Sequence, residues 1–334
     1  MSKQTPLPEV TRVYQNHHID STRWQVFKPR PDDIIVATTQ KSGTTWAQQI
    51  ISLLLFQDGP PPAQFHDLSV FVDMRMSPLD QLDKELEAQT HRRFLKTHTA
   101  LDGFPFHPEV KHVFVTRDGR DLFMSLWNHY SSYSQDFLKL LNQIPGRVGA
   151  PFPPAGDDIH EFWRDWIGRG WFDWESDGYP FWSQFHVVKT WWEYRHLPNI
   201  LLVNYADMLA DLSGQIKRIA DYLDIQITPE YLQKVTELCT FDSMKRRADE
   251  VIPNAGMLFD GGAQTFINKG CNGRWRDVLT AEELATYDSH VASTLTPECA
   301  HWWEHGGAYK PDNTRASQSV VAGLGATPPG AASS

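Results

Sequence analysis

The stretch Asp33-Ile-Ile-Val-Ala-Thr-Thr39 is followed by Gln40-Lys-Ser-Gly-Thr-Thr-Trp46 and by an apolar run that ends at Phe56. The first part is rich in β-branched apolar residues and predicts a buried parallel strand. The run from Trp46 to Phe56 predicts a helix. Gly43 permits a tight turn between them, and its hydroxyl neighbours stand where the first helical amides point outward. Because those amides lack intrahelical partners and carry the positive end of the helix dipole, the stretch predicts a phosphate-binding loop.

Lys41 adds a mobile positive charge to this loop. The residue order differs from the G-x-x-x-x-G-K-[ST] loop of nucleoside triphosphatases, because Lys41 precedes the only glycine. The structural alternative is an ordinary turn between strand and helix, capped by a Ser or Thr side chain. Basic residues later in the chain favour the phosphate-binding interpretation.

The composition of the 334-residue chain narrows the class of protein. A hydrophobic content of 41% suffices for a large core, and no run of about 18 apolar residues predicts a transmembrane segment. The N-terminus carries no stretch of signal-peptide type. A net charge of −10 argues against nucleic acid as a partner, so an anionic ligand requires a local basic cluster. The three widely spaced cysteines predict a reducing, cytoplasmic location.

Predicted strands alternate with predicted helices along the chain, which indicates a single α/β domain with a central parallel β-sheet flanked by helices. The expected order is an N-terminal arm at 1–32, the domain at 33–305 and a disordered tail rich in Gly, Ala, Pro and Ser at 306–334. Residues 241–279 are expected to be mostly irregular. Further strands are expected at 93–98, 112–116 and 200–204, and helices at 78–90, 117–130, 158–167, 183–195, 212–224, 229–238, 280–294 and 297–304.

Polar residues follow three of the predicted strands. Lys96 and His98 are two apart, so their side chains project to the same face of an extended strand. Arg117 ends the next strand, and Ser125 lies two turns into the helix after it. Because ligands of open α/β sheets bind beyond the carboxyl ends of the strands, we expect these residues to meet Lys41 there. Such a cluster suits a ligand with several negative charges.

Four motifs together resemble the sulfotransferases that use 3′-phosphoadenosine 5′-phosphosulfate (PAPS). They are Lys41-Ser-Gly-Thr-Thr-Trp46, Lys96-Thr-His98, Arg117-x7-Ser125 and Lys269-Gly-x-x-Gly-x-Trp275. The similarity extends over roughly residues 30–305 and looks closest to bacterial members, including those that act on glycolipids. It implies the sulfotransferase fold, which is similar to that of P-loop nucleoside triphosphatases. It also implies PAPS as co-substrate, with no metal.

The resemblance implies a role for each matching position. His98 would be the general base, and Lys41 and Lys96 would stabilise charge on the departing phosphate oxygen. The 5′-phosphosulfate would lie on the loop from Lys41 to Thr45. Trp46 would stack on the adenine, with Arg117 at the 3′-phosphate. The implied nucleotide-binding positions are Lys41, Ser42, Gly43, Thr44, Thr45, Trp46, Arg117, Ser125, Tyr205, Phe241, Met244, Lys269 and Gly270.

Some positions depart from the family pattern. Gln40 and Gly119 replace prolines that are common in the family, and both changes should alter loop stiffness more than charge. Asn268 stands where an arginine usually precedes Lys-Gly, which predicts one weakened contact to the 3′-phosphate. Arg274 replaces an aspartate before Trp275. The pattern that many animal members use to dimerise is not evident, so the sequence leaves the oligomeric state open.

The acceptor side is expected to take a small aromatic or lipid-like molecule at a hydroxyl, or less readily an amine. Seven of the 13 tryptophans lie between 160 and 192. They either line an apolar pocket or pack the core, and the sequence does not distinguish the two. Phe71, Met74 and Met76 are candidates for a flexible gate over the site.

Three other functions compete with sulfonate transfer. A nucleotide-binding protein without catalysis is one of them, but His98 together with Lys41 and Lys96 argues against it, because binding alone has no use for a base. A phosphoryl transferase of P-loop type would share the fold, but it would need the Walker order and magnesium-holding acidic residues. A zinc hydrolase is suggested by His301-Trp-Trp-Glu-His305, which places two histidines on one helical face. Glu304 would then be the base, and a third protein ligand would be required.

Overall fold

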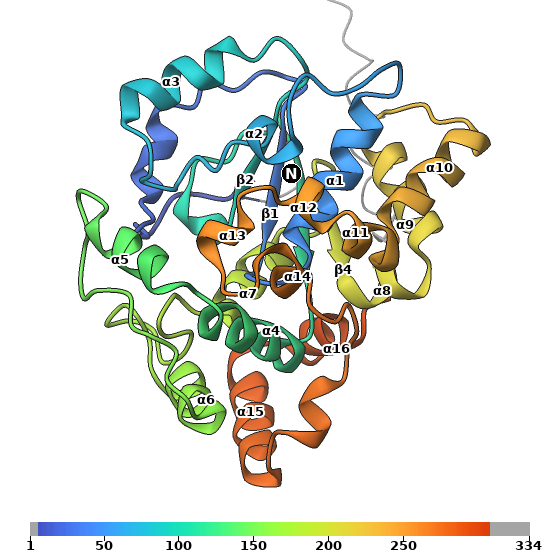
Figure 1. Cartoon of the computed structure of the whole chain (residues 1–334). Helices are drawn as coiled ribbons and strands as arrows, with labels where there is room; N and C mark the ends of the chain where they lie inside the picture. The colour runs from blue at the N-terminus through green and yellow to red at the C-terminus, as the bar shows by residue number, and fades with distance from the viewer. Residues whose placement is uncertain (1–5, 308–334) are drawn as a thin grey trace, which may run out of the picture.

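The computed structural model describes residues 6–307. Its centre is a four-stranded sheet of β1 (Ile34–Thr38), β2 (Phe94–Thr97), β3 (Lys111–Thr116) and β4 (Ile200–Asn204). The strand order is β2-β1-β3-β4, and every pairing is parallel. Figure 1 shows the sheet enclosed by helices, with α5 and α6 on one side and α9 and α10 on the other. The predicted α/β fold with a parallel sheet is confirmed. The tail expected at 306–334 lies outside the described residues except for its first two.

Helices of very different length surround this sheet. The helices are α1 (Thr44–Leu55), α2 (Phe65–Leu68), α3 (Leu79–Ala88), α4 (Gly119–Ser131), α5 (Gln135–Gln143), α6 (Ile159–Gly168), α7 (Gln184–Glu193), α8 (Tyr205–Ala210), α9 (Leu212–Tyr222), α10 (Pro229–Cys239), α11 (Phe241–Arg246), α12 (Ala248–Val251), α13 (Ala255–Leu258), α14 (Gly262–Phe266), α15 (Ala281–Thr294) and α16 (Pro297–His305), with 3-10 helices η1 (Ser21–Val26), η2 (Leu101–Gly103) and η3 (Arg274–Asp277). The long predicted helices are confirmed to within about two residues at most ends.

Both faces of the sheet are buried, as the apolar run at 34–38 predicts. Ile34 and Val36 pack with α1, α9 and α10 on one face, whereas Ile35 and Ala37 pack with α4, α6 and α7 on the other. Side chains alternate along a strand, so a strand covered on both faces needs a continuous apolar sequence. The register then brings the ends of the strands together, because Ala37 pairs with Thr97 and Thr38 with Val115.

The tryptophans of the 160–192 segment belong mainly to the core. Trp163, Trp166, Trp182 and Trp191 are at most 1% exposed, and all four lie in the larger hydrophobic cluster. Trp191 stacks on Phe114 of β3, with ring centroids 5.1 Å apart and planes inclined by 7°. For these four tryptophans, core packing is therefore the correct interpretation.

One sequence expectation about local structure is wrong, and one helix was not foreseen. Residues 241–279 contain α11 to α14 and η3 instead of being mostly irregular, and α5 was not predicted. These helices are short, and glycines in the left-handed conformation, such as Gly261 at φ 84°, interrupt the segment. Short helices depend on tertiary packing more than on propensity, so the local sequence carries only a weak signal for them.

The N-terminal segment packs against the domain. Tyr14, Ile19 and Trp24 are at most 2% exposed and lie in the same hydrophobic cluster as the sheet face toward α4. Asp33 and Arg93 directly precede β1 and β2, and their side chains form a fully buried ion pair at 2.5 Å. Among residues 6–307, no helix is both long and apolar enough to cross a bilayer.

Candidate active site

A cavity of about 340 Å³ opens at the carboxyl edge of the sheet. It joins residues from widely separated parts of the chain, since the loop after β1, the end of β2, helix α4 and the segment 266–274 all contribute. All but one of the predicted site residues line it: Lys41, Gly43, Thr44, Thr45, Trp46, Lys96, His98, Arg117, Ser125, Tyr205, Phe241, Met244, Lys269 and Gly270. The expected convergence of the strand ends is confirmed.

Ser42 is the exception. Its side chain is fully buried, and its hydroxyl is hydrogen-bonded to the Thr39 hydroxyl and to the Gln40 carbonyl oxygen. The Ser42 side chain is therefore turned away from the cavity. Thr44, in contrast, lines the cavity, and its Oγ1 lies 2.7 Å from Oγ1 of Thr38. Ser42 supports the shape of the loop more than its binding surface.

The loop presents a free helix N-terminus to the cavity. Gly43 occupies the N-cap of α1 at φ 96°, and no side chain caps the helix there. Lys41 also has a positive φ, of 58°. A side chain on residue 43 would approach the Tyr205 ring to 3.1 Å. Because the first amides of a 12-residue helix remain open beside lysine, this end of the cavity fits an anion.

Two partly buried lysines increase the positive charge of the cavity. Lys41 Nζ lies 3.2 Å from His129 Nδ1, and Lys96 Nζ lies 4.3 Å from the centre of the Phe71 ring. Within residues 6–307 neither lysine forms an ion pair. Burial, followed by repulsion from Lys96 and Arg117, lowers the pKa of Lys41 to about 7. Burial lowers the pKa of Lys96 to about 8.

His98 has a defined tautomer. Its Nδ1 lies 3.0 Å from the Thr38 carbonyl oxygen and 2.9 Å from Thr38 Oγ1. A carbonyl oxygen can only accept, so we assign the proton to Nδ1, which leaves Nε2 as a free base. Burial, with the charge of Lys96 as the next cause, lowers the pKa of His98 to about 3. The imidazole is therefore neutral at pH 7.

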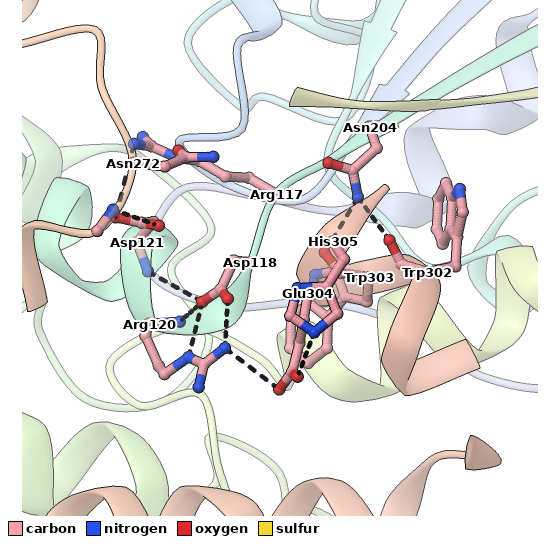
Figure 2. Close-up of polar contacts among 11 residues, drawn as sticks. Arg117, Asp118, Arg120, Asp121, Asn204, Asn272, Trp302, Trp303, Glu304 and His305 are labelled. Atoms are coloured by element: carbon pink, nitrogen blue, oxygen red, sulfur yellow. Dashed lines mark hydrogen bonds and ion pairs between the residues drawn. The ribbon is translucent and has the colours of Figure 1, made fainter. Parts of the chain in front are cut away.

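Arg117 adds a third cation to the cavity lining. Figure 2 shows its guanidinium beside Asn272 and Asp121. Nε donates to Asn272 Oδ1 at 2.8 Å, and Nη2 donates to the Cys271 carbonyl at 2.6 Å. The same group lies 4.4 Å from the centre of the Tyr205 ring. These contacts hold the cation on the side of the cavity formed by the segment from Lys269 to Asn272.

Close packing shapes the site around Gly270. Its φ is 62°, and an added Cβ would lie 2.1 Å from the Phe241 ring. Trp46 is fixed as well, because its Nε1 donates to the Cys239 carbonyl at 2.7 Å and its ring lies edge-on to Tyr205. Only a backbone without a side chain at position 270 can pass so close to an aromatic ring. The Lys269-Gly270 motif thus forms part of the cavity wall.

The apolar part of the cavity contains residues that the sequence analysis missed. His129 lies one turn after Ser125 on α4, and its Nε2 is 3.1 Å from the Tyr133 hydroxyl. The spacing of four residues between Ser125 and His129 on one helix could have indicated that both face the cavity.

Of the three residues proposed as a gate, Phe71 and Met74 line the cavity, whereas Met76 is 52% exposed and lies outside its lining. The apolar lining is completed by Leu126, Tyr133, Phe137, Leu141, Phe181, Ile252, Leu258, Phe259, Phe266 and Ile267.

The residues that depart from the family pattern make defined contacts in the structure. The Gln40 side chain accepts from the Tyr130 hydroxyl at 2.9 Å, which ties the loop to α4. An added Cβ at Gly119 would lie 2.7 Å from the Tyr287 hydroxyl, so a small residue is required there. Asn268 donates to the Asn128 side chain, and Arg274 lines the cavity.

The residues of the suggested zinc motif lie outside the cavity and form structural contacts. The rings of His301 and His305 are 4.9 Å apart, but Glu304 forms an ion pair with Arg120 at 3.5 Å. Figure 2 shows this contact beside Asp118, which also pairs with Arg120. Among residues 6–307 no group of three or more His, Cys, Asp or Glu side chains could hold a metal. The motif therefore packs α16 against α4.

A parallel sheet with a cationic cavity at its carboxyl edge and a base beside it defines a group-transfer enzyme acting on a nucleotide-like anion. The family model described as the sulfotransferase domain matches residues 31–297. The chain belongs to this family. The predicted resemblance is therefore confirmed, and the protein is a sulfotransferase instead of the phosphoryl transferase considered as an alternative.

Relatives agree with this assignment over nearly the whole chain. The chain is 33% identical over 332 residues to the glycolipid sulfotransferase of Mycobacterium tuberculosis, covering 94% of this chain and 100% of that protein. It is 27% identical to sulfotransferase 1A1 of Rattus norvegicus, covering 81% and 87%. Retinol dehydratase in complex with androsterone and the inactive cofactor PAP has a TM-score of 0.63 at 26% identity, covering 84% of this chain and 87% of that chain. Mouse sulfotransferase SULT7A1 complexed with PAP, at 19% identity and a TM-score of 0.63 with coverage of 83% and 89%, shares the fold.

Proposed function

We propose that this protein transfers the sulfonate group of PAPS to a hydroxyl of a lipid-like acceptor. The observation that carries the proposal is that basic side chains, the base His98 and many apolar side chains line one cavity. A phosphorylated nucleotide suits the basic side chains, and an apolar alcohol suits the apolar ones. The names of the mycobacterial relatives and the PAP bound to retinol dehydratase support the same assignment.

The residues present fit the donor nucleotide. The open N-terminus of α1 and Lys41 suit the 5′-phosphosulfate, because both offer positive charge to an anion. Arg117 and Lys269, which line the same cavity, suit the 3′-phosphate. The proposed donor-binding residues are Lys41, Gly43, Thr44, Thr45, Trp46, Arg117, Ser125, Tyr205, Phe241, Met244, Lys269 and Gly270, with the backbone of Ser42.

The proposed reaction assigns a role to each group beside the bond that changes. PAPS supplies a sulfonate whose bond to the 5′-phosphate breaks as the acceptor oxygen bonds to sulfur. His98 Nε2 takes the proton of the acceptor hydroxyl. Lys41 and Lys96 stabilise the negative charge that develops on the departing phosphate oxygen. The products are a sulfate ester and PAP, and the mechanism uses no metal.

The acceptor class follows from the apolar part of the cavity. Phe71, Met74, Phe137 and Leu258 present hydrophobic surface there, which favours a lipid-like or aromatic alcohol. An amine remains a poorer candidate. We also place the protein in the cytoplasm, a proposal supported by its few and widely spaced cysteines, which are free in the structure.

A transfer assay tests the proposed function. The protein is incubated with PAPS and a panel of long-chain alcohols, phenols and steroids in the presence of EDTA, and sulfated product is measured. We expect product from at least one lipid-like alcohol. His98→Gln should abolish turnover and leave the affinity for PAP within about twofold. His301→Gln, a surface change outside the cavity, is the matched control. Tighter binding of ATP than of PAP, or unimpaired turnover by His98→Gln, would contradict the proposal.

A further inference from the structure

His98 and His129 are not the only histidines described in the cavity, because His18 lines it as well. His18 lies in the N-terminal segment, and that segment is fixed to the cavity wall. Ile19 forms an antiparallel bridge with Met74, and the backbone amide of Arg75 donates to the His18 carbonyl at 2.8 Å. Burial is the main cause that lowers the pKa of His18, and the charge of Lys96 is a smaller one. His18 therefore belongs to the acceptor side of the cavity.

The neighbouring His17 determines the tautomer of His18. His17 is fully buried, and its Nε2 lies 3.0 Å from the Pro180 carbonyl oxygen. Since a carbonyl oxygen can only accept, Nε2 of His17 carries the proton and its Nδ1 is a free acceptor. The Nδ1 atoms of the two histidines are hydrogen-bonded to each other at 2.5 Å. His18 must consequently donate from Nδ1, which leaves its Nε2 unprotonated.

This Nε2 atom is an accessible acceptor without a partner. Among residues 6–307, no hydrogen bond involves this atom. It is also not one of the solvent-inaccessible side-chain atoms that lack a partner, so it is accessible. Burial lowers the pKa of both histidines, so both rings are neutral at pH 7 and the chain of donors just described applies. An unprotonated ring nitrogen on a cavity wall selects an O–H or N–H donor over an anion.

A simple fatty alcohol cannot satisfy both histidines. Its only hydroxyl loses its proton to His98 in the proposed reaction, so His18 would remain unpaired. We propose that His18 binds a second hydroxyl of the acceptor through Nε2, and that the acceptor class is a lipid-like polyol or sugar. The inference rests on the proposed sulfotransferase function. His18 would thus determine specificity for the acceptor, and His17 would be a positioning residue that acts through His18.

Two probes with the same alkyl tail test this inference. Octyl β-D-glucoside offers several hydroxyls, and 1-octanol offers one. His18→Phe keeps an aromatic ring and removes the acceptor nitrogen. We expect kcat/KM for the glucoside to fall about tenfold, equivalent to about 1.4 kcal/mol, with that for octanol unchanged within about twofold. His18→Gln retains an acceptor oxygen and should recover part of the preference. His301→Phe is the surface control.

The outcomes separate this inference from the proposed function. Equal losses for both probes in His18→Phe, or no change in either, would overturn the role of His18 even though sulfonate transfer stands. If the native protein transfers sulfonate to neither probe, the dissociation constants of both probes are measured by calorimetry in the presence of PAP. A glucoside affinity that falls about tenfold in His18→Phe, against an unchanged octanol affinity, then supports the inference, and a parallel change in both contradicts it.

Discussion

Binding of PAP should be accompanied by uptake of protons. Burial in the cavity is the main cause that lowers the pKa of Lys41 to about 7 and that of Lys96 to about 8. At pH 8, about a tenth of Lys41 and about half of Lys96 are then protonated. An anionic nucleotide offsets the burial and repulsion that cause these shifts, so both lysines should return to their ordinary pKa range and become charged. The expected uptake is about 1.4 protons per PAP.

Calorimetry in two buffers of different ionisation enthalpy, such as Tris and HEPES, measures this number. Phosphate groups, with a second pKa of about 6, are already ionised at pH 8 and contribute little. Because the complex holds more protons than its parts, the affinity should decrease as the pH rises above about 7. Lys41→Arg carries a permanent charge and should retain only the Lys96 contribution, about 0.5 proton. Tight binding without proton uptake at pH 8 would refute the assignment of Lys41 as partly neutral.

Three further changes test the nucleotide site and the fold. Arg117→Ala should weaken PAP binding by about 10- to 100-fold in a calorimetric titration, and should leave adenosine 5′-phosphosulfate, which lacks the 3′-phosphate, within about twofold. Arg93→Leu leaves its buried carboxylate partner unpaired and should lower the free energy of unfolding in urea by about 3–5 kcal/mol, whereas Lys139→Ala, in an exposed pair, should not change the denaturation midpoint. Gly270→Ala places a Cβ 2.1 Å from an aromatic ring and should reduce PAP affinity at least about tenfold, with Gly256→Ala, which has open space, as control.

The cationic part of the site could be predicted because its residues follow strands directly. Lys41, His98 and Arg117 need only a parallel sheet to meet at one edge, and the apolar run at 34–38 indicates such a sheet. Local sequence was sufficient for this inference. Ser42 shows the limit of such a prediction. The sequence places hydroxyl residues at 42, 44 and 45, but it does not reveal which of them turns away from the cavity toward Thr39.

The apolar part could not be predicted because its residues are assembled by tertiary contacts. Leu258 and Phe266 lie on short helices, and Phe137 lies on the unpredicted α5. The density of tryptophans around Trp166 is compatible with a pocket or with core packing, and most of these side chains belong to the core. The role of His18 could not be predicted because it depends on a residue that is distant in the sequence. The carbonyl oxygen that determines the tautomer of the neighbouring His17 belongs to Pro180.

The charge balance of the cavity explains why the base and the donor site adjoin. A histidine whose pKa is about 3 is a weak base, and the main cause after burial is the charge of Lys96, with Lys41 contributing as well. An anionic donor beside the lysines offsets this charge, so the pKa of His98 should rise once the donor is bound. The same interaction that drives proton uptake by the lysines therefore strengthens the base. A base that gains strength only beside its donor favours binding of the nucleotide before the acceptor loses its proton.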